Sequence, residues 1–86
     1  MLIDTIRQKL EAAFSPQRLD IDDDSAEHAG HEGAKAGAHL RIVIVAHAFT
    51  GQSEVARHRQ IYRVLSAELQ HGIHALVITA KAPLEK

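Results

Sequence analysis

The chain has 86 residues, of which 45% are hydrophobic but only 3% aromatic, and it contains no cysteine. This length suits one domain with a small aliphatic core. The lack of cysteine excludes disulfides, thiol catalysis and a metal centre built from the chain's own thiolates. A net charge of −1 at pH 7 gives the molecule no overall attraction to nucleic acid or to an anionic membrane. No apolar run approaches the roughly 20 residues that span a bilayer, and the amino terminus lacks the pattern of a secretory signal. We therefore expect a single cytoplasmic domain over residues 1–86, without membrane spans.

The first predicted element is an amphipathic helix over residues 2–14. Its apolar residues recur at spacings of three and four: Ile3, Ile6, Leu10 and Phe14. Pro16 ends this helix, because proline disfavours helical geometry in the residue before it. Leu19 and Ile21 then alternate with charged residues, which predicts a short half-buried strand. An acidic run at residues 22–24 ends that strand.

Residues 26–38 are expected to form a flexible loop rich in glycine, alanine and histidine. The segment contains no large apolar residue, so it can bury little surface. His28 and His31 are three residues apart and could face one metal ion, but a lone H-x-x-H in a glycine-rich loop is a weak signal of a metal site. On the residues alone, a solvated loop with titrating imidazoles is the favoured interpretation.

Two strands and a helix are predicted in the second half of the chain. The sequence HLRIVIVA, residues 39–46, contains consecutive β-branched residues and predicts a buried central strand. Ser53 is a suitable N-cap for a helix over residues 54–70. Gly72 is a suitable C-terminal stop for that helix, in a left-handed conformation. A third strand is predicted over residues 73–80.

The predicted order of elements is α-β-β-α-β. Because a helix connects the second and third strands, these strands should be parallel, whereas the long connection between the first two allows an antiparallel pair. We expect an α+β sandwich in which the helices cover one face of a three-stranded mixed sheet. The other face stays partly open, and residues 81–86 form a short tail. Four side chains are expected to be largely buried: Val43, Ile44, Leu65 and Leu76.

The residues do not form a pattern typical of an enzyme site, and we expect no enzymatic activity. The serines lie in no nucleophile elbow, and the glycines form no phosphate-binding loop. Arg59 and Arg63, with Arg57 nearby, are candidates for nucleic-acid binding because residues four apart on a helix can meet two phosphates. However, acidic residues on the same helix favour an ordinary solvated surface. On the residues alone, His74 is most simply a buried histidine bonded to a backbone carbonyl, and His39 a half-buried residue of the sheet.

Three stretches together resemble the BolA family. They are IDDDSAEHAGH (residues 21–31), HLRIVIVAHAFTGQSEVARHRQIY (residues 39–62) and GIHALVITAKAP (residues 72–83). The resemblance runs from about Ile6 to Pro83, nearly the whole chain. One departure is His39-Leu40, where the family usually has histidine followed by phenylalanine. The resemblance implies a fold related to the KH nucleic-acid-binding fold, in agreement with the predicted element order.

The resemblance further implies a role in iron–sulfur cluster trafficking and iron regulation. Family members bind monothiol glutaredoxins and share a [2Fe–2S] cluster with them. The implied ligands are His74, in the I-H-A-L stretch, and a histidine of the loop, either His28 or His31; His31 is slightly favoured because glycines flank it. The partner and its glutathione would supply the remaining, thiolate ligands. We expect a monomer alone and a heterodimer with the partner.

A second role implied by the resemblance is that of a DNA-binding transcriptional regulator. It would use the KH-like surface around the glycine turn and the second helix. The residues that would contact phosphate are Gly51, Arg57, Arg59 and Arg63. Because the chain is almost neutral, we expect any autonomous DNA binding to be weak.

Overall fold

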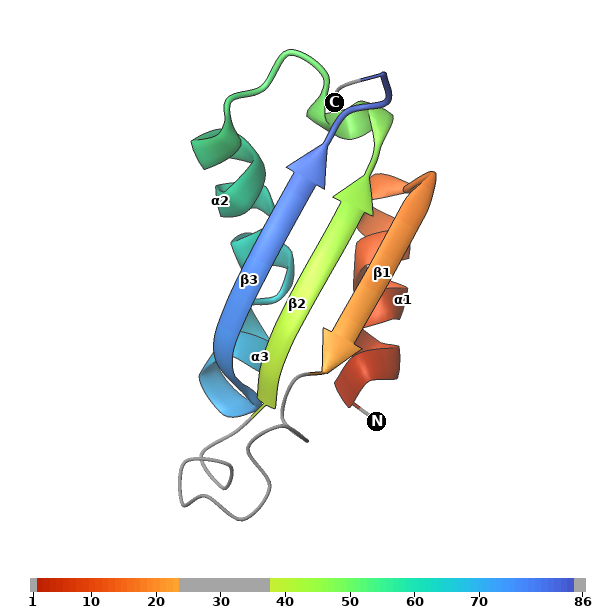
Figure 1. Ribbon diagram of the computed structural model, residues 1–86. Coiled ribbons are helices and arrows are strands. Elements are labelled where there is room, and N and C mark those ends of the chain that lie inside the picture. Colours follow the sequence, from red (N-terminus) through yellow and green to blue (C-terminus); the bar gives the residue numbers. More distant parts are fainter. Residues whose placement is uncertain (1, 24–37, 85–86) are drawn as a thin grey trace.

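The computed structural model describes residues 2–23 and 38–84. Helices cover one face of a three-stranded sheet (Figure 1). The elements in chain order are α1 (Leu2–Phe14), β1 (Arg18–Asp23), β2 (Ala38–Val45), η3 (His47–Phe49), α2 (Glu54–Val64), α3 (Ser66–His71) and β3 (Ile73–Lys81). The predicted α+β class is confirmed, and α1 has the bounds expected from its apolar periodicity. The expected loop at residues 26–38 lies almost entirely outside the described residues.

The central strand β2 pairs with β1 on one side and with β3 on the other. β1 and β2 are antiparallel, and β2 and β3 are parallel. Figure 1 shows this directly, because the arrow of β1 points opposite to the other two. The predicted strand directions are therefore confirmed. They place the amino-terminal ends of β2 and β3 together at one end of the sheet.

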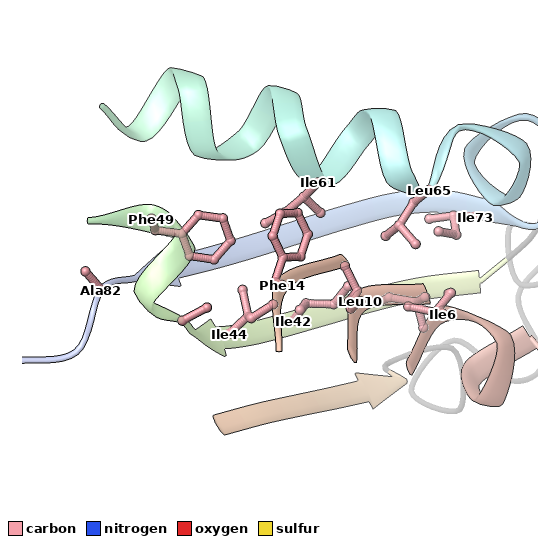
Figure 2. Close-up of a cluster of buried hydrophobic side chains, with 12 residues drawn as sticks. Ile6, Leu10, Phe14, Ile42, Ile44, Phe49, Ile61, Leu65, Ile73 and Ala82 are labelled. Atoms are coloured by element: carbon pink, nitrogen blue, oxygen red, sulfur yellow. The ribbon is translucent and has the colours of Figure 1, made fainter. Parts of the chain in front are cut away.

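The core lies between the sheet and the helices (Figure 2). Leu40, Ile42 and Ile44 alternate along β2 and are at most 2% exposed, so they face the helices. The rings of Phe14 and Phe49 pack with their centres 5.0 Å apart. Each fully buried aliphatic or aromatic side chain contributes about 1.5–3 kcal/mol to folding. The other buried hydrophobic residues are Ile6, Leu10, Ala46, Ile61, Leu65, Ile73 and Ala82.

Two of the four residues predicted to be largely buried are fully buried, and two are not. Ile44 and Leu65 are fully buried, as expected. Val43 is less buried than predicted, since it lies on the open face and is only half-buried. Helices cover only one face of β2, so its consecutive β-branched residues alternate between a covered and an uncovered face. Leu76 is also only half-buried, although it packs against the core.

The single helix predicted over residues 54–70 is two helices that meet at Leu65. This residue has φ −99° and ψ 18°, outside helical geometry, while its side chain is completely buried. The segment contains neither proline nor glycine, so no residue type indicates the break. The Lys9 ammonium donates hydrogen bonds to the Glu68 carboxylate at 2.8 and 3.0 Å, which links α3 to α1.

Gly72 ends α3 for a different reason from the one expected. Its φ of −152° is negative, so the residue is not left-handed. A Cβ atom at this position would lie 3.1 Å from Cδ1 of Leu2 in α1. Glycine therefore leaves room here for the end of the Leu2 side chain.

Candidate functional site

His74 lies in a β-bulge at the amino-terminal end of β3. Ala38 pairs with Ile73 and His39 pairs with Ala75, so β3 has one more residue than β2 at this point. Both Ile73 and Leu76 pack into the core, although residues three apart face opposite sides of a regular strand. The additional residue resolves this conflict and leaves the His74 side chain exposed. The interpretation of His74 as a buried histidine is therefore wrong.

The imidazole of His74 lies beside that of His39. The two ring centres are 5.1 Å apart, and the ring planes are inclined by 38°. His39 is half-buried, as expected, and points to the open face because its neighbour Leu40 points to the helices. Two imidazoles from adjacent parallel strands thus meet at one end of the sheet.

The loop histidines expected as ligands, His28 and His31, lie outside the described residues, so their role stays a prediction. Within residues 2–23 and 38–84, no group of three or more histidine and acidic side chains could hold a metal ion. An iron–sulfur cluster bound at His74 therefore needs ligands from beyond this part of the chain. The exposed imidazole itself fits such a cluster, since neutral imidazole is a suitable ligand for iron.

The arginines proposed for nucleic-acid binding do not share one surface. Arg57 is 7% exposed, and its Nη1 donates a hydrogen bond to the carbonyl oxygen of Ala80 in β3 at 3.0 Å. Arg59 and Arg63 are exposed on α2. Because residues 57 and 59 are about 200° apart around a helix axis, they face nearly opposite directions. Of the three arginines, Arg57 therefore makes a buried contact with β3, whereas Arg59 and Arg63 lie on the solvent-exposed surface.

Gly51 lies in the exposed turn before α2 and has a positive φ of 77°. No atom lies within 4 Å of the position that a Cβ would take there. Its backbone conformation, rather than a close approach by another group, requires glycine. Ser53 is the N-cap of α2, as expected, since its hydroxyl accepts a hydrogen bond from the Ala56 N–H at 3.1 Å.

An exposed apolar surface on α2 was not recognised from the sequence. Val55 and Tyr62 are large apolar or aromatic residues, yet they are 60% and 46% exposed. Together with His58, Arg59 and Arg63 they line a shallow depression of about 480 Å³. The spacing of seven between Val55 and Tyr62 places them on one face, roughly 100° from the buried Ile61. Plotting the residues of α2 around the helix axis would have separated the face of Val55 and Tyr62 from the buried face of Ile61.

Comparisons with known proteins agree on one family. A family model described as BolA-like protein matches residues 10–85. The chain is 45% identical to SufE-like protein 1 from Arabidopsis thaliana, over 93% of this chain and 23% of that protein. It is 38% identical to the DNA-binding transcriptional regulator BolA from Escherichia coli, over 91% of this chain and 72% of that protein. The solved structure of BolA1 from Arabidopsis thaliana superposes with a TM-score of 0.86 at 37% identity, covering 100% of this chain and 96% of that one.

Several of these relatives are longer than the chain. It spans less than a quarter of SufE-like protein 1 and 57% of BolA-like protein 1 from the mouse. None of the helices in the described residues is long and apolar enough to cross a membrane. The family model, the sequence identities and the shared fold agree over nearly the whole chain. The chain belongs to the BolA-like protein family.

Proposed function

We propose that this protein is a non-enzymatic cytoplasmic adaptor that binds a monothiol glutaredoxin and shares a [2Fe–2S] cluster with it, in iron–sulfur cluster trafficking or iron regulation. The observation that supports this proposal most is the exposed imidazole of His74, held in a bulge beside His39. The family resemblance implies a histidine ligand at this position. Strand pairing holds the backbone on both sides of His74, so the imidazole needs little reordering to bind.

The ligand count explains why a partner is needed. A [2Fe–2S] cluster takes four ligands, and this chain has no cysteine. His74 supplies one imidazole, and His28 or His31 supplies a second. The partner's cysteine and its glutathione supply the thiolates. When bound, a cluster with imidazole ligands accepts an electron at a higher potential than one with thiolates alone.

Reconstitution with a purified monothiol glutaredoxin tests the proposal. The two proteins are mixed with iron, sulfide and glutathione, and the visible absorption and circular dichroism of the complex are recorded after gel filtration. We expect a heterodimer whose cluster spectrum differs from that of the glutaredoxin alone. His74→Ala should lose that spectrum while melting at the wild-type temperature, because its side chain is exposed.

His71→Ala is the matched control, since His71 is exposed three residues away, at the end of α3. It should leave the cluster spectrum unchanged. His28→Ala and His31→Ala, made singly and together, identify the loop ligand. A folded His74→Ala protein that keeps the wild-type spectrum would contradict the assignment of His74.

Binding to DNA is a second candidate function. Arg59 and Arg63 lie exposed on α2, one helical turn apart, and the Escherichia coli relative is described as a DNA-binding transcriptional regulator. With Arg57 buried against β3, this surface offers two arginines rather than three. Two phosphate contacts support only weak binding that depends on the salt concentration. We therefore rank DNA binding below the adaptor function.

A further inference from the structure

We propose that His39 and His74 form a binding site for a divalent transition-metal ion, of the class of Zn²⁺ or Co²⁺, in the protein without its partner. The site uses two imidazoles of this chain and needs neither sulfide nor glutathione. It therefore does not rest on the proposed cluster function, although His74 takes part in both.

The distance between the two rings suits a shared metal ion. A zinc ion lies about 2.0–2.1 Å from the nitrogen that binds it, which is about 3.2 Å from the ring centre. Two rings bound at a tetrahedral angle of about 109° then have their centres about 5.2 Å apart. The centres of His39 and His74 are 5.1 Å apart. Nε2 of His39 is buried, so the exposed His74 ring must turn until a nitrogen of each ring points to the ion.

The backbone holds the two histidines in this arrangement. His39 pairs with Ala75, the residue directly after His74, and the ladder between β2 and β3 continues from there to Val45 and Lys81. A regular strand would turn His74 toward the helices, because Leu76 faces them. The bulge instead brings its ring beside His39. Ligands fixed by paired strands lose little conformational entropy when they bind a metal ion.

The chemistry of the site selects the class of ion. Imidazole suits zinc, copper, iron and nickel, whereas magnesium and calcium prefer oxygen ligands. His74 is exposed, so an ion can enter from solvent. Because no group of three potential ligands occurs in the described residues, the two imidazoles leave coordination positions for water or for a ligand from another molecule. We therefore expect weaker binding than at a closed site with four protein ligands.

Cobalt provides the direct test, because tetrahedral Co²⁺ absorbs visible light. Titration of the purified protein alone at pH 7.5 should produce this absorption, saturate at one ion per chain and be reversed by Zn²⁺. His74→Ala and His39→Gln should each weaken Co²⁺ binding at least tenfold. His58→Ala and His71→Ala, which remove histidines elsewhere on the surface, should leave the affinity unchanged.

Two further measurements keep the test decisive. Far-ultraviolet circular dichroism shows whether each variant is folded, and NMR of the wild type reports which histidine rings shift when Zn²⁺ is added. The His39 and His74 rings should shift together. Wild-type Co²⁺ affinity in a folded His39→Gln or His74→Ala protein would overturn the proposal, as would Zn²⁺ shifts that leave either ring unaffected. Since neither glutaredoxin nor sulfide is present, these results are separate from those of the reconstitution.

Discussion

The bulge at the start of β3 and the basic surface of α2 show two different ways in which candidate functional side chains become exposed. At the bulge, an additional residue interrupts the pairing with β2 and turns His74 away from the helices toward His39. On α2, regular helical geometry exposes Arg59 and Arg63 and buries Arg57. The first arrangement departs from regular structure, whereas the second follows from helical periodicity alone.

This difference indicates where to look for function. A bulge interrupts the regular pairing of a strand, and such interruptions are frequent next to active sites. Exposed arginines on a helix are common on protein surfaces and by themselves indicate little. The comparison therefore favours His74 over the arginine surface. This comparison can be tested by substituting buried and exposed residues of α2 and measuring stability and DNA binding.

Replacement of Arg57 should have the largest effect on stability. Arg57→Ala removes a buried side chain and the hydrogen bond to Ala80 that connects α2 to β3. We expect a loss of about 2 kcal/mol in the free energy of unfolding, measured by urea denaturation. Arg57→Met keeps an unbranched side chain that fills the same space and should lose only about 1 kcal/mol, the value of one hydrogen bond. An unfolding curve of Arg57→Ala that overlays that of the wild type would show that Arg57 belongs to the exposed surface after all.

A smaller loss is expected at Gly51, where the turn before α2 has a positive φ. Gly51→Ala should cost about 1 kcal/mol, because the left-handed conformation strains an alanine while no neighbouring atom clashes with its Cβ. Gly51→Asn should recover most of this stability, since asparagine tolerates the left-handed region. Thermal melts of both variants make the measurement. If the asparagine and alanine variants are equally unstable, backbone strain is not the reason for glycine.

The ion pair between Lys9 and Glu68 should make stability depend weakly on acid pH. The hydrogen bond from the Lys9 ammonium lowers the pKa of Glu68 below its ordinary value of 4.5. The unfolded chain therefore binds this proton more readily than the folded one. The stabilisation is present above about pH 4.5 and is lost as the pH falls through the lowered pKa. Lys9 is 38% exposed and solvent screens the pair, so the contribution is at most about 1 kcal/mol.

Urea denaturation of the wild type and of Glu68→Gln at pH 7 and at pH 3 measures this contribution. The stability difference between the two proteins at pH 7 should shrink as the pH falls to 3, because the wild-type carboxylate takes up a proton and loses its charge. An equal difference at both pH values would show that the charge on Glu68 contributes nothing. This ion pair connects α1 to α3, the helix that immediately precedes the bulge at His74. The test therefore also measures how strongly α3 is held next to the histidine site.

Much of the fold was predictable because its signals are local and periodic. The apolar spacing of α1 predicts its bounds, and the helix between β2 and β3 predicts that those strands are parallel. The break at Leu65 was not predictable, because it arises from packing and no proline or glycine marks it. The burial of Val43 was overestimated because a run of β-branched residues does not show whether one or both faces of a strand are covered.

The candidate site was only partly predictable. The I-H-A-L stretch pointed to His74, but its contact with His39 depends on the register between β2 and β3, which the bulge shifts. A signal for the bulge does exist in the sequence. Ile73 and Leu76 are three residues apart, an odd spacing, whereas Leu76, Ile78 and Ala80 follow the even spacing of a strand. Arg57 and Arg59 could not be told apart by composition, since only the angle around the helix separates them.

The smallest effect on stability is expected at the arginine surface itself. Arg59→Ala and Arg63→Ala remove exposed side chains, so each should change the free energy of unfolding by less than about 0.5 kcal/mol.

Wild-type binding to duplex DNA should be no tighter than about micromolar at physiological salt, the range of non-specific contacts. The logarithm of the affinity should fall with the logarithm of the salt concentration with a slope of about −2, one unit for each arginine, and the double variant should lose this dependence. Fluorescence anisotropy with labelled DNA across a salt series measures both quantities. A nanomolar, sequence-specific complex that depends on Arg59 and Arg63 would reverse the comparison, because it would make the regular helix surface the main functional site.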